Sequence, residues 1–236
     1  MNKTTTAVLI AGFALGAVSR AGAHVDAPKR YLEVNAGGQL PAHTLTTTAT
    51  FPLYKETATV TGSETIGAGL SFDVGGGYRI KKSLAIGVDV SMFTRNADGT
   101  AFAALPDQFF FNRYSTVAVP TSSLKRTEYG GHFKVVYFRP VGDKLGLALS
   151  AGPSLIRFSQ DIPSVTIAGG LQSATVEKQW GTAVGANAGM DLNYLLTSRY
   201  GTGAFVRYVF AKGDLPSASG VRVGGLQAGV GLRLLF

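Results

Sequence analysis

The chain has 236 residues, of which 45% are hydrophobic and only 15% charged, with 31 glycines and no cysteine. Soluble domains usually carry roughly 25% charged residues, so the composition departs from that class. The net charge of +8 raises the question of nucleic-acid binding. In the long connections expected below, however, acids outnumber bases, so no basic surface follows a phosphate backbone and we expect no nucleic-acid partner.

The first residues predict a secretory signal peptide. Lys3 gives a positive start, residues 7–18 are apolar, and Ala21-Gly22-Ala23 has the small-x-small form of a cleavage site. An anchoring helix is the alternative, but a bilayer span needs roughly 20 apolar residues. We expect cleavage after Ala23, leaving one domain over 24–236, and the lack of cysteine agrees with an exported protein that depends on its β-ladder.

Eight segments with a two-residue period follow in order. They are 31–40, 66–80, 84–95, 126–139, 145–157, 178–194, 201–211 and 221–236. The connections 41–65, 96–125, 158–177 and 212–220 are long, whereas 81–83, 140–144 and 195–200 are short. Long and short connections that alternate around an even number of strands predict an all-β, eight-stranded antiparallel up-and-down transmembrane β-barrel.

Ionisable residues separate by parity along these segments. A charge on the lipid face near mid-membrane costs about 2–4 kcal/mol, and the outward-parity charges Arg139, Arg157, Lys178 and Arg222 all fall at strand ends. The inward parity collects the following residues, which we expect to line the lumen: Glu33, Asp73, Arg79, Asp89, Arg95, Arg126, Glu128, His132, Lys134, Asp191, Arg207 and Arg233. Confined charges must pair, so a self-neutralised lumen is expected. The alternative is a charged passage for ions or small solutes, or a gate in which His132 senses pH.

Outward aromatic residues predict two interfacial girdles. Tyr129, Trp180, Tyr208 and Phe210 fall near the outer rim, and Tyr78, Tyr137, Tyr194 and Phe236 near the inner one. A soluble β-sandwich is the alternative, but it would not require charges to be confined to strand ends.

Catalytic and metal chemistry have little support. The three histidines are His24, His43 and His132, and His43 has neighbouring threonines but no local serine or acid. There is no pair of histidines at metal-ligand spacing, and the glycine runs 75–77 and 224–225 are followed by no strand-to-helix turn. We expect no enzyme, metal or cofactor, and an outer-leaflet lipid-modifying enzyme is only a remote alternative.

The connection 96–125 carries an unusual apolar load, with Phe109-Phe110-Phe111 after the apolar stretch 101–105. Such a load should not lie bare in water. It is expected to fold onto the barrel rim, to enter the outer leaflet, or to bind a surface partner.

The last segment alternates to the terminal aromatic, with Leu232, Leu234 and Phe236 on its apolar face. This ending resembles the last strand of bacterial outer-membrane barrels, in which the terminal aromatic is part of the signal read by the barrel assembly machinery. Together with the eight segments, it resembles the small OmpA transmembrane-domain, OmpX and OmpW type of barrel. The resemblance implies a monomer in the bacterial outer membrane, in contact with lipid and lipopolysaccharide. We expect a structural and surface-interaction barrel, and a narrow porin-like channel is the alternative.

Overall fold

The computed structural model describes residues 29–40, 43–168 and 171–236, and this part of the chain is built of β-strands joined by short turns. The strands are β1 (Arg30–Gln39), β2 (His43–Leu53), β3 (Glu56–Ile66), β4 (Gly69–Lys81), β5 (Leu84–Pro106), β6 (Tyr114–Pro140), β7 (Leu145–Ala168), β8 (Leu171–Leu195), β9 (Tyr200–Leu215) and β10 (Ala218–Leu235). Among the described residues, no helix is long and apolar enough to cross a membrane.

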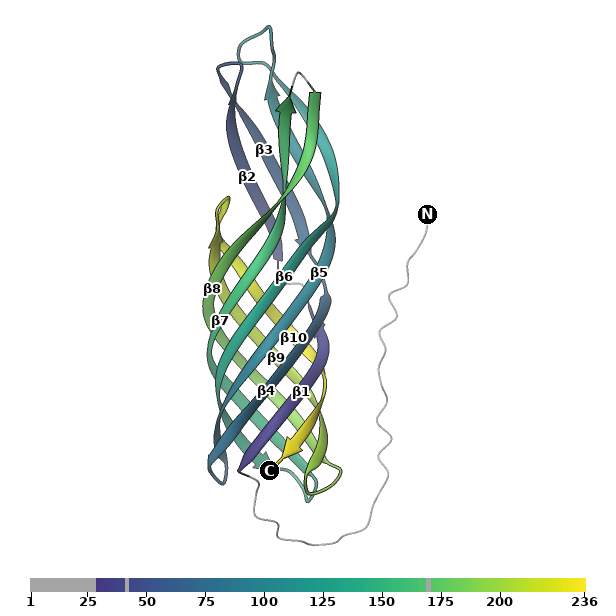
Figure 1. Ribbon diagram of the computed structural model, residues 1–236, viewed down its shortest axis with the longest axis vertical. Coiled ribbons are helices and arrows are strands. Elements are labelled where there is room, and N and C mark those ends of the chain that lie inside the picture. The colour runs from purple at the N-terminus through teal and green to yellow at the C-terminus, as the bar shows by residue number, and fades with distance from the viewer. Residues whose placement is uncertain (1–28, 41–42, 169–170) are drawn as a thin grey trace, which may run out of the picture.

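Eight of these strands close into an antiparallel barrel. The order runs β5-β4-β1-β10-β9-β8-β7-β6, and β6 pairs again with β5. At the seam between β1 and β10, the Arg30 N–H donates to the carbonyl of Phe236 and the Phe236 N–H donates to the carbonyl of Arg30. The seam places Arg30 and Phe236 at one end of the barrel, and we call the opposite end the outer end (Figure 1). The eight-stranded barrel is thereby confirmed, and a two-sheet sandwich is excluded because the ladder is continuous.

All four of the expected long connections are wrong as loops. Strand β9 continues to Leu215 and β10 begins at Ala218, so only 216–217 remain as a turn within 212–220. Strands β2 and β3 occupy most of 41–65, β5 and β6 stay paired as far as Pro106 and Tyr114, and β7 and β8 stay paired as far as Ala168 and Leu171. The segment expected to start at 66 instead begins at Gly69, because Ile66 still belongs to β3. These extensions lie beyond the part of the barrel whose outward side chains are apolar. Their sequences therefore lack the continuous apolar face by which a barrel strand is recognised. Threonine, which favours strands, is frequent in β2 and β3.

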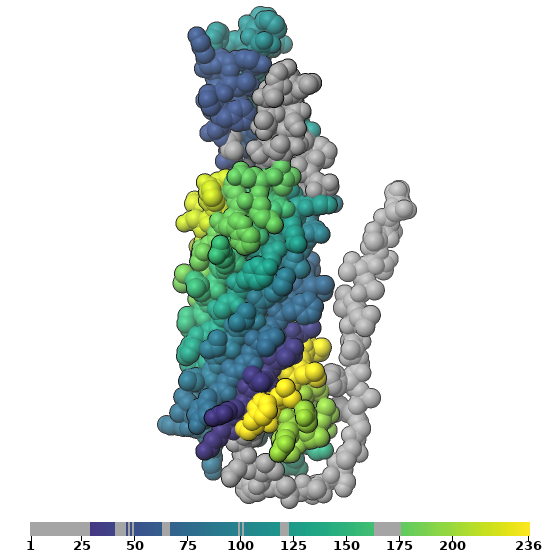
Figure 2. Space-filling model, viewed as in Figure 1, coloured from purple at the N-terminus to yellow at the C-terminus, as the bar shows by residue number. Residues whose placement is uncertain are grey.

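The β2–β3 hairpin lengthens the sheet outside the barrel. Residues 59–64 of β3 pair with residues 99–104 of β5, above the region where β5 pairs with β4. One face of this outer sheet is held by a small apolar cluster of Ala58, Val60, Ala103 and Leu105, against which Phe51, Leu53 and Val117 pack. The outer sheet projects well past the outer end of the barrel (Figures 1 and 2).

Burial alternates along the barrel strands as their two-residue period requires. In β9, every second residue from Gly201 to Ala211 is buried, and the intervening side chains are exposed or half-buried. The buried set faces the lumen and the exposed set faces outward. The fold therefore creates two surfaces of different chemistry, an enclosed lumen and an outer wall.

Candidate functional site: the barrel lumen and the outer wall

The lumen holds most of the ionisable residues that the parity of the sequence assigns to it. Ten of the twelve have buried side chains: Glu33, Asp73, Asp89, Arg126, Glu128, His132, Lys134, Asp191, Arg207 and Arg233. The other two, Arg79 and Arg95, are half-buried near opposite ends of the barrel.

Seven of these side chains form one alternating chain of opposite charges. It runs Asp191–Arg233–Glu33–Lys134–Asp89–Arg207–Asp73, and its members come in that order from β8, β10, β1, β6, β5, β9 and β4. Besides the direct Lys134–Glu33 pair, the shortest contacts of the chain are 2.7 Å from Lys134 Nζ to Asp89 Oδ2 and 2.9 Å from Arg233 Nη2 to Asp191 Oδ1. This ion-pair chain joins seven of the eight barrel strands across the lumen, so each strand is tied to strands that are distant in the sequence.

Amides complete the ion-pair chain. The Asn35 side chain donates to Asp73 Oδ1 at 2.6 Å, and its own carbonyl accepts a hydrogen bond from Arg233. Arg233 also donates to Asn193 Oδ1 at 2.9 Å. Buried charges are stabilised when their remaining donors and acceptors are satisfied, and these amides do so for Asp73 and Arg233. Asp89 and the terminal nitrogens of Arg207 are held by ion pairs alone among the described residues.

A second polar layer lies closer to the outer end. Arg126 Nε donates to Glu128 Oε1 at 2.7 Å, and the other oxygen of Glu128 accepts the Gly224 N–H at 3.1 Å. Gln39 and Gln227 are hydrogen-bonded to each other, and Gln39 reaches Glu128 at 3.4 Å. Backbone and amide groups therefore stabilise this pair, as they do the ion-pair chain.

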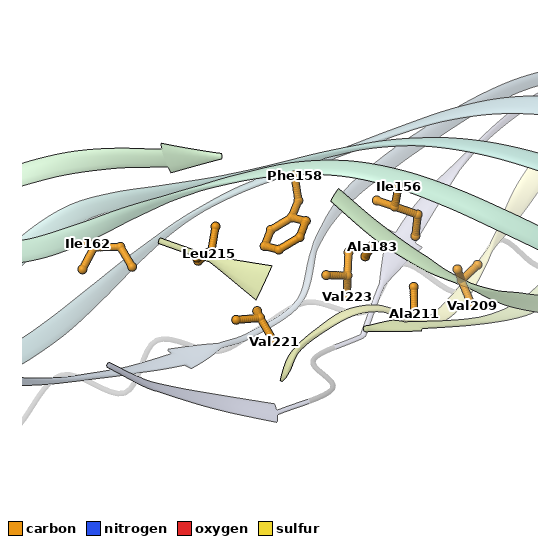
Figure 3. Close-up of a cluster of buried hydrophobic side chains, with 9 residues drawn as sticks. All are labelled: Ile156, Phe158, Ile162, Ala183, Val209, Ala211, Leu215, Val221 and Val223. Atoms are coloured by element: carbon orange, nitrogen blue, oxygen red, sulfur yellow. The ribbon is translucent and has the colours of Figure 1, made fainter. Parts of the chain in front are cut away.

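The outer end of the lumen is apolar, which the sequence analysis missed. Nine buried side chains fill it: Ile156, Phe158, Ile162, Ala183, Val209, Ala211, Leu215, Val221 and Val223 (Figure 3). We call this set the apolar plug. Phe158 is fully buried, and the Arg126 guanidinium lies 5.6 Å from its ring. The inward parity of Phe158 and Ile156 could have indicated apolar side chains in the lumen. Only ionisable residues, however, were assigned to the lumen from the sequence.

His132 lies between two serine hydroxyls. Its Nε2 is 2.8 Å from Ser91 Oγ, its Nδ1 is 2.8 Å from Ser154 Oγ, and Asn187 donates to Ser154 Oγ at 2.9 Å. A nucleophile–base pair needs an acid to orient the histidine and a route for substrate, whereas His132 is 2% exposed and hydrogen-bonds to hydroxyls on both sides. The geometry fits a hydrogen-bonded lumen residue. The hydroxyl partners come from β5 and β7, so local sequence gave no sign of them.

Arg79 and Arg95 were expected in the lumen charge network, but they lie outside it. Arg79 donates to the carbonyl of Lys82 at 3.2 Å, and its guanidinium lies 4.4 Å from the centroid of the Phe138 ring. Arg95 donates to the carbonyl of Asn96. Neither belongs to an ion pair among the side chains that the structure describes. Each lies at the end of a barrel segment and is half-buried, and one nitrogen of each guanidinium is buried without a hydrogen bond among the described residues.

Three lumen carboxylates are close enough to be considered as metal ligands. One oxygen each from Glu33, Asp73 and Asp89 lies within 4.8 Å of the others. Lys134 and Arg207 already contact these same carboxylates. The cationic side chains thus occupy the place of an ion, and the group is better described as part of the ion-pair chain.

The aromatic residues expected in girdles lie on the outer wall. Tyr78, Tyr129, Tyr137, Trp180, Tyr208, Phe210 and Phe236 are between 44% and 63% exposed, and Tyr194 is half-buried. Near the outer end, the Arg157 guanidinium lies 5.3 Å from the Trp180 ring and Lys212 Nζ lies 5.8 Å from the Phe210 ring. On the terminal strand, Leu232 is 63% exposed and Leu234 is half-buried.

No protein-family model matches the chain, and no curated protein matches it. Among solved structures, Neisserial surface protein A is similar over 90% of this chain and 100% of its own, with 19% identity and a TM-score of 0.48. Ail, the attachment invasion locus protein of Yersinia pestis, is similar over 89% of this chain and 100% of its own, with 10% identity and a TM-score of 0.41. The N-terminal β-barrel domain of Pseudomonas aeruginosa OprF is similar over 89% of this chain and 100% of its own, with 13% identity and a TM-score of 0.34. At such identities and scores, function has to be argued from the residues of this chain.

Proposed function

We propose that the protein is a closed structural barrel of the bacterial outer membrane that carries an interaction sheet on its outer side. The observation that supports this most directly is the apolar belt, a set of exposed aliphatic and aromatic side chains on all eight barrel strands. Soluble monomers rarely expose a continuous apolar surface of more than a few hundred Å². A belt that encircles a closed barrel suits lipid as its surroundings.

The belt is built from the outward residues of the barrel strands. Its members include Leu32, Val34, Leu70, Phe72, Val74, Val88, Val90, Phe133, Val135, Leu149, Leu155, Val184, Met190, Val206, Val230 and Leu232, each between 44% and 69% exposed. A lipid environment would satisfy these side chains, and each barrel strand is hydrogen-bonded to a neighbouring strand on both sides.

The outward cations suit an outer leaflet of lipopolysaccharide. Arg157, Lys178, Lys212 and Arg222 are exposed on β7, β8, β9 and β10, towards the outer end of the barrel. Long basic side chains at this level reach the phosphates of the lipid headgroups. Arg30 and Phe236 then lie on the periplasmic side, where the terminal aromatic would serve assembly. The proposed signal peptide, residues 1–23, lies outside the described residues.

The lumen favours a structural barrel over a channel. An ion crossing it would meet the apolar plug at the outer end and would have to break the ion-pair chain below, and each step is costly because desolvation of a charge is costly. The charged lumen still supplies a reason to consider a narrow channel for small solutes. The remote alternative, a lipid-modifying enzyme, would depend on His43, whose side chain lies outside the described residues.

Membrane fractionation, gel migration, conductance and an assay of lipid turnover test the proposal. The protein should fractionate with outer membranes and, when folded in lipid, should migrate differently on gels before and after heating. In planar bilayers it should give no stable unit conductance. Conductance that changes on Asp89→Asn or Arg207→Gln would favour the channel, and lipid hydrolysis or acyl transfer abolished by His43→Ala would favour the enzyme.

A further inference from the structure

The turn at the far end of the outer sheet exposes three consecutive phenylalanines. Phe109 is 82% exposed, Phe110 59% and Phe111 74%, within the turn that joins β5 to β6. We call these three residues the aromatic tip. Side chains that are each more than half exposed are packed against no core, so folding of the outer sheet leaves the aromatic tip free for another contact.

The backbone of the turn is nevertheless held in place. Asp107 Oδ1 accepts the N–H groups of Phe109 at 2.8 Å and Phe110 at 3.3 Å, and the Asp107 N–H donates to the carbonyl of Arg113 at 2.7 Å. From the neighbouring β2–β3 turn, Glu56 Oε1 accepts the Asn112 N–H at 2.8 Å. The hairpin β2–β3 therefore braces the turn, and the aromatic side chains are presented from a defined backbone.

The acidic and the basic side chains at the far end of the outer sheet have different roles. The two acids, Asp107 and Glu56, accept hydrogen bonds from backbone amides of the turn. The two cations, Lys55 and Arg113, are exposed, and the Arg113 guanidinium lies 5.6 Å from the Phe110 ring. The exposed charged side chains beside the aromatic rings are thus cations, whereas the two acids are half-buried and face the backbone of the turn.

The aromatic tip is too far from the barrel to reach its own bilayer or the barrel rim. Met92 on β5 pairs with Tyr129, which belongs to the outer girdle, and β5 continues from there to Pro106. At about 3.3 Å per residue this continuation is roughly 45 Å of strand. The partner of the aromatic tip therefore has to approach from outside.

We propose that the aromatic tip inserts into the headgroup region of a second, anionic lipid bilayer that faces the outer membrane. This inference rests on the proposed function, since it requires a barrel that holds the outer sheet above its own membrane. Bulky apolar side chains next to exposed cations are the combination that binds anionic lipid surfaces. A fluid interface accepts three side chains that project from one turn, whereas a protein site would have to supply a pocket for each.

The test uses the protein folded into nanodiscs of phosphatidylcholine, mixed with separate vesicles that carry or lack phosphatidylglycerol. Flotation of the vesicles should recover the nanodiscs, and more so with the anionic lipid. Phe109→Ser together with Phe111→Ser should weaken recovery at least about tenfold, because two exposed aromatic anchors are lost. Phe102→Ser is the matched control, since Phe102 is 47% exposed on β5 outside the turn.

Two further variants separate the contributions. Lys55→Gln with Arg113→Gln should remove the preference for anionic vesicles, an effect of about tenfold on recovery. The reason is that each cation near an anionic lipid surface adds its own attraction to the binding. Phe110→Trp in a Trp180→Phe background should show a blue-shifted emission on adding vesicles, and brominated lipid should quench it.

The outcomes are distinct. Intact nanodiscs that fail to float with either vesicle, or that float equally well with Phe109→Ser and Phe111→Ser, would overturn the lipid proposal and leave a protein as the partner of the aromatic tip. Failure of the protein to enter nanodiscs at all would overturn the membrane barrel itself and this inference with it.

Discussion

Lys134 Nζ lies 2.7 Å from Asp89 Oδ2 in the lumen, and the same ammonium group contacts Glu33. The contacts join β6 to β5 and β1. All three side chains are at most 5% exposed, so water does not compensate their charges. Glu33 also pairs with Arg233 and Asp89 with Arg207, so Lys134 is the central member of the ion-pair chain.

Replacement of Lys134 by methionine should lower the free energy of unfolding by about 3–5 kcal/mol. The substitution keeps most of the length of the side chain but removes the cation that Glu33 and Asp89 share. Each carboxylate then keeps one longer ion pair, to Arg233 at 3.5 Å or to Arg207 at 3.3 Å, and a poorly compensated buried charge is strongly destabilising. Urea titration of the barrel folded in lipid vesicles measures the effect. Lys144→Met, at an exposed turn, is the control and should change stability by less than about 0.5 kcal/mol. A similar small loss for both variants would mean that lumen water solvates the two carboxylates.

Gly229→Ala should impair closure of the barrel. A Cβ at Gly229 would lie against the carbonyl oxygen of Ala36 and 2.6 Å from the Cα of Gly37, both backbone atoms of β1 that cannot rotate away. We expect a smaller fraction of folded protein and a loss of more than about 1 kcal/mol from overpacking at the seam. Gly146→Ala is the matched control, because a Cβ there meets nothing within 4 Å. Equal folding yields for the two variants would contradict the tight seam.

The sorting of side chains between lumen and outer wall could be predicted from the sequence, since it needs only the two-residue period. Asp73 and Val74, for example, are neighbours in the chain and lie on opposite faces. The partners could not be predicted, because strand order and register decide which inward residues meet. Asp191 on β8 pairs with Arg233 on β10, and β9 lies between these two strands. No local sequence pattern indicates the two strand pairings that bring these residues together.

The outer sheet could not be predicted from the sequence for a different reason. Its buried apolar face is small and consists of Ala58, Val60, Ala103 and Leu105. The sequences of β2, β3 and the upper part of β5 therefore lack the long alternating row of apolar residues on which the parity argument depends. The few buried positions, such as Val60 and Ala103, acquire their meaning only when β3 pairs with β5. Arg79 and Arg95 have inward parity but lie outside the ion-pair chain, because parity does not say how far along the lumen a residue lies.

Val60→Asp should unfold the β2–β3 hairpin and leave the barrel closed. Val60 is 3% exposed in the cluster that joins the hairpin to β5, and a carboxylate there has no described partner within the cluster. Limited proteolysis of the folded protein in vesicles should cut within residues 43–66, while the barrel keeps its resistance to unfolding by detergent at room temperature. Thr57→Asp, on an exposed position of the same strand, should remain protected. Loss of the folded barrel in Val60→Asp would show that the outer sheet and the barrel fold as one unit.

Trp180 is the only tryptophan in the chain, so its fluorescence reports the position of the outer girdle directly. Its side chain is 45% exposed beside Arg157, which predicts a place at the level of the lipid headgroups. In vesicles, its emission should be quenched more by lipids brominated near the headgroup than by lipids brominated near the end of the acyl chain. Val184 is 69% exposed on the same face of β8, four residues closer to the barrel centre. Val184→Trp with Trp180→Phe should reverse the order of quenching, because a further ~13 Å of strand carries the ring towards the middle of the bilayer. If both tryptophans were quenched by a water-soluble agent and by neither lipid, the outer wall would face water and the membrane barrel would be wrong.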